Sequence, residues 1–142
     1  MRKPRMIIFD DDTMILEVLN NHFSRMNFEL QCFSQPILCS HCENTTPCAD
    51  IIITDFLMPR INGFELLTHQ TQQGCTINIK NKAIVSGALP EEQIDKVSEL
   101  AGTFFGKPFS LKELDAWTKE CVSRVDLSQP LKSITACFFE EV

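Results

Sequence analysis

The sequence predicts an α/β fold in which a doubly wound, five-stranded parallel sheet carries helices on both faces. Two observations support this fold class. Short runs rich in Ile, Val and Phe recur along the chain, and segments with helical spacing of apolar residues lie between them. Parallel strands need a long return connection, which a helix supplies, so this alternation indicates a parallel sheet with right-handed crossovers.

Five segments have the composition of strands: residues 6–9, 28–33, 51–54, 83–85 and 103–105. The clearest helix covers residues 15–26, where apolar side chains recur at spacings of three and four. A second helix is predicted from Pro90 to Gly102 because proline suits a first helical turn, and a third follows Ser110, a good N-cap. Weaker helical patterns cover residues 35–42 and 64–73.

Length and composition favour one globular domain. The chain has 142 residues, of which 44% are hydrophobic and 23% charged, and a chain of this size buries a sufficient core without disulfides or structural metal. The element pattern ends near residue 125. We therefore expect a domain over residues 1–125 and a C-terminal extension or linker over residues 126–142, which could fold back over the domain, lead to a further domain or contact another subunit.

Charge and hydropathy exclude several function classes. The net charge of -6 does not support direct binding of nucleic acid, which relies on clustered Lys and Arg. No apolar stretch reaches the ~20 residues that span a membrane. The basic N-terminus is not followed by the apolar centre of a signal peptide, so we expect a cytoplasmic protein.

The seven cysteines are expected to be reduced thiols in that compartment. Cys39, Cys42 and Cys48, together with His41, are ligand types that zinc accepts. Their spacing is not a strong zinc pattern, and free cysteine packs as a small hydrophobic residue. We favour packing within the weak helix over residues 35–42, and a role beyond packing remains an open alternative.

Polar side chains stand where four of the predicted strands end: Asp10, Asp11 and Asp12 after the first, Asp55 after the third, Ser86 after the fourth and Lys107 shortly after the fifth. The carboxyl ends of parallel strands meet at one edge of the sheet, where such folds bind ligands. Closely packed carboxylates repel one another, a cost that a divalent cation removes. Carboxylate oxygens with open positions beside them suit magnesium.

The chain resembles the receiver domains of two-component response regulators in four motifs, which stand in the family's order: IIFDDD, IIITDFLMPRINGFELL, AIVSG and FFGKPF. The resemblance covers about residues 5–125. It implies a flavodoxin-like fold with strand order 2-1-3-4-5, in a stand-alone or isolated receiver. It also implies a phosphoprotein of a two-component phosphorelay, a signalling domain rather than an enzyme with a separate substrate.

By this resemblance, Asp55 is the phosphoacceptor, which takes a phosphoryl group from the phosphohistidine of a sensor histidine kinase or a phosphotransfer protein. Asp10 and Asp11 hold Mg²⁺ together with Asp55 and the backbone carbonyl of Leu57. Phosphoryl transfer needs an aligned nucleophile and neutralised charge on the phosphoryl oxygens, and the metal and a lysine supply that charge.

The same resemblance assigns Lys107 as the cation nearest the phosphoryl group and Ser86 as the hydroxyl that donates to it. Phe104 occupies the switch position, where the family often has Tyr, and Pro108 fixes the turn that aims Lys107, through a cis bond. The new charge on the acceptor then changes a surface. We place that surface, for a downstream partner or a homodimer, on residues 90–122.

Two alternatives remain open at this point. Residues 9–13 also fit the Asp-x-Asp-x-Thr start of haloacid-dehalogenase-like phosphatases, in which Asp10 would be the nucleophile of an enzyme. That interpretation leaves the motif around Asp55 unexplained and lacks the further acidic pair after the lysine. A degenerate receiver that acts only as a binding module is disfavoured because every expected site position is filled.

Overall fold

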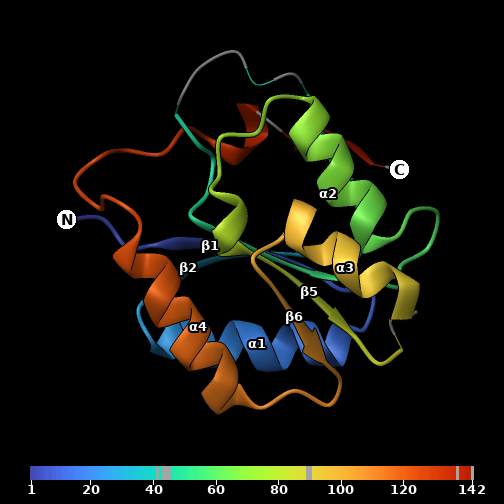
Figure 1. The fold of residues 1–142 in the computed structure, drawn as a ribbon. Coiled ribbons are helices and arrows are strands. Elements are labelled where there is room, and N and C mark those ends of the chain that lie inside the picture. Colours follow the sequence, from blue (N-terminus) through green and yellow to red (C-terminus); the bar gives the residue numbers. More distant parts are fainter. Residues whose placement is uncertain (41, 43–45, 89–90, 137, 142) are drawn as a thin grey trace.

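A central sheet separates two pairs of helices in the computed structural model, which describes residues 1–40, 42, 46–88, 91–136 and 138–141 (Figure 1). All neighbouring strands of this sheet are parallel, in the order β2-β1-β4-β5-β6. Its strands are β1 (Arg5–Phe9), β2 (Glu29–Phe33), β4 (Ile51–Asp55), β5 (Lys82–Ser86) and β6 (Thr103–Gly106). The predicted parallel α/β sheet of five strands is confirmed.

The strand order needs one qualification. The predicted order 2-1-3-4-5 describes this sheet when its five strands are counted alone. An additional strand, β3 (Ile37–Cys39), lies outside the sheet and shifts the numbering of those that follow. It pairs antiparallel with β7 (Phe138–Glu141) in a separate two-stranded sheet.

Each face of the central sheet has its own helices and its own core. Helices α1 (Thr13–Arg25) and α4 (Leu111–Ser123) cover one face, and α2 (Gly63–Gln72) and α3 (Glu91–Leu100) cover the other (Figure 1). Side chains alternate along a strand, so Met6 and Ile8 of β1 pack toward α1 and α4 while its other apolar residues pack toward α2. None of the helices among the described residues has the length and apolar composition to cross a membrane.

Local sequence explains where the helices begin. Asp12 caps α1 by accepting from the N–H of Met14 at 2.9 Å, and Ser110 caps α4 as predicted. Asn62 and Glu65 form a reciprocal capping box at the start of α2. The expected helix start at Pro90 lies outside the described residues. A short 3-10 helix, η1 (Ile79–Asn81), leads into β5, and another, η2 (Ile134–Ala136), precedes β7.

The predicted helix over residues 35–42 is wrong, because this segment contains the extended strand β3. Its partner β7 lies about a hundred residues later in the sequence, where local periodicity cannot detect it. The imidazole Nε2 of His69 on α2 lies 2.8 Å from the carbonyl oxygen of Cys39 and ties β3 to that helix. Ile37, Leu38 and Ile134 pack against the core on the same face.

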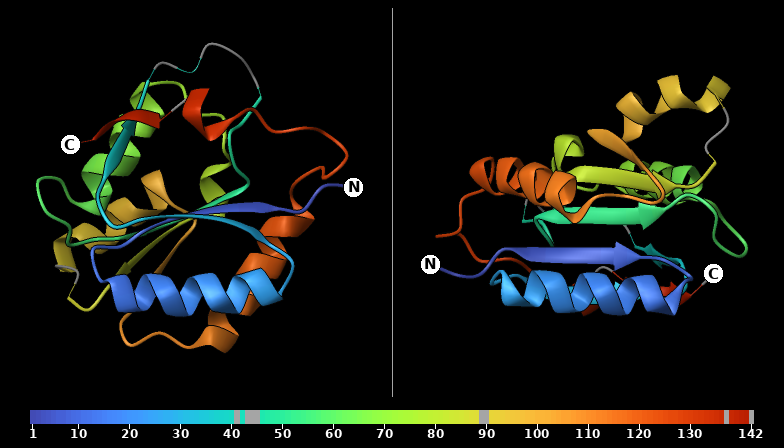
Figure 2. Two further views of the ribbon diagram at one scale, coloured as in Figure 1. Left: turned by 180° about the vertical axis from the view of Figure 1, so that it is seen from behind. Right: turned by 90° about the horizontal axis from the view of Figure 1, so that it is seen from below.

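The C-terminal extension folds back over the domain, which is one of the three arrangements that we considered for it. The N–H of Lys132 donates to the carbonyl of Pro47 at 3.1 Å, and Arg5 donates to the carbonyl of Lys132 at 2.9 Å. Figure 2 shows β7 beside β3. This places the extension near β2, at the opposite edge of the sheet from β6, and not over the face of residues 90–122.

The cysteines do not form a metal cluster in the described part of the chain. Cys39 and Cys48 are buried in the core and Cys42 is partly buried. The only group of three or more metal-ligand residues found among the described residues consists of aspartates. His41 lies outside the described residues.

Candidate functional site

Three carboxylates meet where β1 and β4, neighbours in the sheet, end. Asp10 and Asp55 are buried, with 3% and 6% of their surface exposed, whereas Asp11 is exposed. Each contributes an oxygen within 4.8 Å of the others. The predicted convergence of these residues is therefore observed, and the group can hold a metal ion through hard oxygen ligands.

Lys107 reaches this group from the loop after β6. Its Nζ lies 3.1 Å from Asp10 Oδ2 and 3.3 Å from Asp55 Oδ1. Burial lowers the pKa of Lys107, but hydrogen bonding and attraction from the two carboxylates outweigh this effect and raise the pKa above its ordinary value. The side chain is therefore an ammonium that bridges two buried carboxylates. The Lys107–Pro108 peptide bond is cis, as the resemblance implies.

The carboxyl of Asp55 differs in acidity from an ordinary aspartate. Burial raises its pKa from 3.8 to about 6, and repulsion from Asp10 adds to the effect. The ammonium of Lys107 acts in the opposite direction. A divalent cation or a second ammonium near the site would favour the ionised form, which is the form that acts as a nucleophile.

Ser86 and Lys107 are linked through the backbone. Ser86 is buried at the end of β5, and its carbonyl oxygen accepts from the N–H of Lys107 at 2.9 Å. Its hydroxyl Oγ accepts from the N–H of Ala88 at 3.1 Å, which fixes the loop after the strand. The hydroxyl and the ammonium therefore belong to adjacent strand ends.

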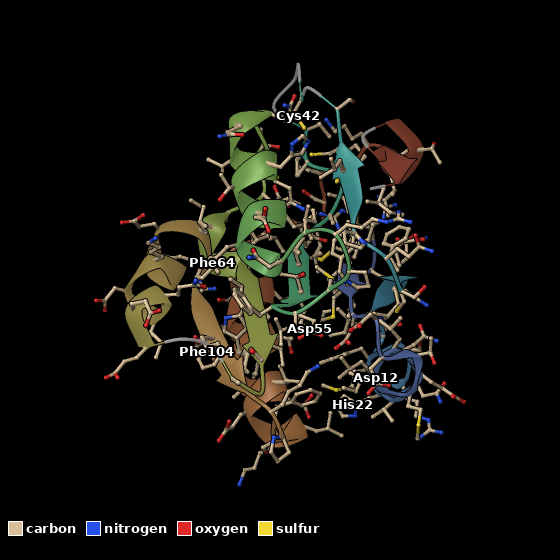
Figure 3. All side chains as sticks on the ribbon, turned by 90° about the vertical axis from the view of Figure 1, so that its right-hand side faces the viewer. Asp12, His22, Cys42, Asp55, Phe64 and Phe104 are labelled. Carbon is tan, nitrogen blue, oxygen red and sulfur yellow. The ribbon has the colours of Figure 1, made fainter. Side chains whose placement is uncertain are left out.

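Phe104 is partly buried on β6 and packs against the core cluster on the α2 and α3 face. Figure 3 shows it on the α3 side of Asp55, with Asp12 on the other side at the start of α1. Leu57 lies exposed in the loop after β4. Metal binding by its backbone carbonyl stays a prediction.

One contributor to the site, Gly63, was not predicted from the sequence. Its N–H donates to the carbonyl of Phe56 at 2.8 Å, which joins the first turn of α2 to the end of β4. A Cβ atom at this position would lie 2.7 Å from the backbone oxygen of Asp55. In the sequence, Gly63 lies within the motif IIITDFLMPRINGFELL, directly after Asn62. Its close contact becomes evident only once the helix is packed on the strand.

Comparisons with known proteins show which sequences and folds the chain is similar to. No family model matches the chain. The chain is 29% identical over 134 residues to the transcriptional activator protein PfeR of Pseudomonas aeruginosa. It is 25% identical over 130 residues to the alkaline phosphatase synthesis transcriptional regulatory protein PhoP of Bacillus subtilis. Each match covers 89% of the chain, but the chain spans only 40% of PfeR and 51% of PhoP.

Similar solved structures include the receiver domain of the Francisella response regulator 1452, with a TM-score of 0.70 and 22% identity. They also include the receiver domain of HemR from Leptospira biflexa, with a TM-score of 0.71 and 20% identity. The matches cover 87% and 92% of this chain and the whole of each receiver domain. The chain therefore has the fold of response regulator receiver domains, and the resemblance carried by its four motifs is confirmed.

Proposed function

We propose that the chain is the receiver of a phosphorelay, which accepts a phosphoryl group on Asp55 from a phosphohistidine. The observation that carries this proposal is the single ammonium of Lys107 set between Asp10 and Asp55 at 3.1 and 3.3 Å. A buried nucleophilic carboxylate, a second carboxylate for a metal and a fixed cation form the set that phosphoryl transfer requires.

The residues fit Mg²⁺ as the metal. Asp10, Asp11 and Asp55 offer three carboxylate oxygens close together, and the carbonyl of Leu57 would be a fourth protein ligand. When bound, Mg²⁺ neutralises charge on the phosphoryl oxygens. No other cofactor is proposed.

The chain's own residues perform the remaining steps. An ionised oxygen of Asp55 attacks phosphorus while the bond from phosphorus to the donor histidine nitrogen breaks. Lys107 and the hydroxyl of Ser86 donate to the phosphoryl oxygens, so both are drawn toward the modified side chain. Because their backbones are hydrogen-bonded, the two loops move together, and Phe104 repacks next to them.

The proposed partners follow from this reaction. A sensor histidine kinase or a phosphotransfer protein is the donor, in the cytoplasm, and the output passes through the face of residues 90–122 to a downstream protein or a second copy. The relatives are named as transcriptional regulators, but the chain spans about half of their length or less. We propose a receiver over residues 1–125 with an extension over residues 126–142. The net charge of -6 gives no support for direct contact of these residues with DNA.

The phosphatase alternative, with Asp10 as nucleophile, gains no support from the geometry. Asp10 Oδ1 accepts from the N–H of Asp12 at 2.9 Å, and Oδ2 accepts from Lys107 at 3.1 Å. Both oxygens of this carboxylate are therefore hydrogen-bonded, which suits a residue that positions charge rather than one that attacks.

Intact mass spectrometry tests the proposal. The wild type and Asp55→Asn are incubated with acetyl phosphate, with Mg²⁺ or with EDTA. The wild type should gain one phosphoryl group only when Mg²⁺ is present, and Asp55→Asn should gain none. No gain in the wild type, or an equal gain in Asp55→Asn, would reject the proposal.

A further inference from the structure

A buried lysine lies beside a partly exposed thiol at the end of α2 that is remote from the carboxylates. Lys82 is only 1% exposed. Its Nζ donates to Gln70 Oε1 at 2.9 Å and to Cys75 Sγ at 3.4 Å. The N–H of Cys42 donates to the carbonyl oxygen of Gln73, the residue directly after α2. The label of Cys42 in Figure 3 therefore marks this end of the helix, which lies away from Asp55.

Gln70 leaves an unused donor at the same place. The residue is 1% exposed, and its Nε2 has no hydrogen-bond partner among the described residues. Nε2 and Oε1 share one carbon atom, and Oε1 contacts the ammonium of Lys82, so the unused donor lies next to that ammonium. A buried donor without a partner is energetically unfavourable. An additional acceptor oxygen on Cys75 would relieve this cost.

Two other described thiols, Cys32 and Cys121, have different surroundings. Burial raises the pKa of Cys32, which disfavours its thiolate. Burial also raises the pKa of Cys121 to about 12, although Arg124 lies 3.7 Å from its sulfur. Cys75 combines partial exposure with a lysine donor, the surroundings in which reactive cysteines occur.

We propose that Cys75 is a modification site for hydroperoxides, with Lys82 and Gln70 as its positioning residues. The thiolate sulfur attacks one oxygen of the hydroperoxide, so an S–O bond forms and the O–O bond breaks. The sulfur is oxidised by two electrons to a sulfenic acid, and with hydrogen peroxide the other oxygen leaves as hydroxide and takes a proton to become water. Lys82 stabilises the anionic sulfur, and the Gln70 amide donates to the new oxygen.

This proposal does not depend on phosphorylation of Asp55, and its test is separate. The full chain is treated with hydrogen peroxide and dimedone, and the adduct on each cysteine is measured by peptide mass spectrometry. Cys75 should be labelled about tenfold faster than Cys32, because a lysine donates to the sulfur of Cys75 whereas burial disfavours the thiolate of Cys32. Equal labelling of the two would overturn the proposal.

Two variants test the positioning residues. Lys82→Met removes the ammonium. Gln70→Glu keeps the buried ammonium of Lys82 and gives it a carboxylate as its partner in place of the amide oxygen. Both should reduce labelling of Cys75 toward the rate of Cys32, with circular dichroism as the check on folding. If Lys82→Met does not fold, Gln70→Glu decides. Unchanged labelling of Cys75 in a folded variant would overturn the assigned role.

Discussion

Lys107 and Asp10 are held together across the sheet edge, with Nζ 3.1 Å from Oδ2, and the same ammonium lies 3.3 Å from Asp55. The backbone N–H of Lys107 also donates to Ser86. The side chain of Lys107 thus contacts the proposed acceptor and a proposed metal ligand, and its backbone contacts the neighbouring strand.

Lys107→Ala should retain the fold and lose the response to phosphorylation. The variant keeps the backbone hydrogen bond to Ser86 and removes only the ammonium that lies 3.3 Å from Asp55. Amide NMR shifts around Ser86 and Phe104 on addition of beryllofluoride, a phosphoryl mimic, are the measurement. Shifts like those of the wild type in Lys107→Ala would contradict this role.

Asp11→Ala should abolish Mg²⁺-dependent phosphorylation with little effect on stability, because Asp11 is exposed. Asp12→Ala is a matched control on the next residue. Asp12 caps α1, so its loss should lower the free energy of unfolding by about 1 kcal/mol while phosphorylation persists. Intact mass and thermal melting measure the two effects. Phosphorylation of Asp11→Ala at the wild-type level would contradict the assigned metal site.

Asp55→Asn should stabilise the metal-free protein in a manner that depends on pH. The pKa of Asp55 is raised from 3.8 to about 6, so between these values the folded protein holds a proton that the unfolded chain has released. Folding stability of the wild type therefore falls as pH rises through this window. Above pH 6 in EDTA, the variant should be more stable by on the order of 3 kcal/mol. The gap should close toward pH 4, and a gap independent of pH would contradict the prediction.

Gly63→Ala should destabilise the protein and weaken phosphorylation together. The added Cβ would lie 2.7 Å from the backbone oxygen of Asp55, so α2 or the end of β4 must shift. Such overpacking costs about 1–3 kcal/mol. Gly106→Ala is the matched control, since a Cβ there meets nothing within 4 Å. Equal melting temperatures for the two variants would show that the contact at Gly63 is not restrictive.

Local patterns were sufficient for most of the fold and for the site. Runs of buried Ile and Val mark the strands, and acids placed directly after them meet because parallel strands end at one edge. The β3–β7 pair could not be predicted in this way because its partners are far apart in sequence. The contact of Gly63 with Asp55 and the contact of Lys82 with Cys75 also depend on how α2 packs on the sheet.

The response to phosphorylation should be concentrated on the face formed by α3, β6 and α4. Ser86 ends the strand that precedes α3, Phe104 lies on β6, and Lys107 follows β6 shortly before α4. The residues proposed to sense the phosphoryl group thus adjoin these elements. A modification shifts an equilibrium only through contacts that differ between two states, and we expect the contacts of these residues to differ.

Hydrogen exchange with and without beryllofluoride measures this response. We expect protection changes in α3, β6 and the first turn of α4. The extension should change little, because it packs near β2 at the other edge of the sheet. Asp55→Asn is the control in which beryllofluoride should have no effect. Changes confined to α1 and α2 would show that the signalling surface lies on those helices instead.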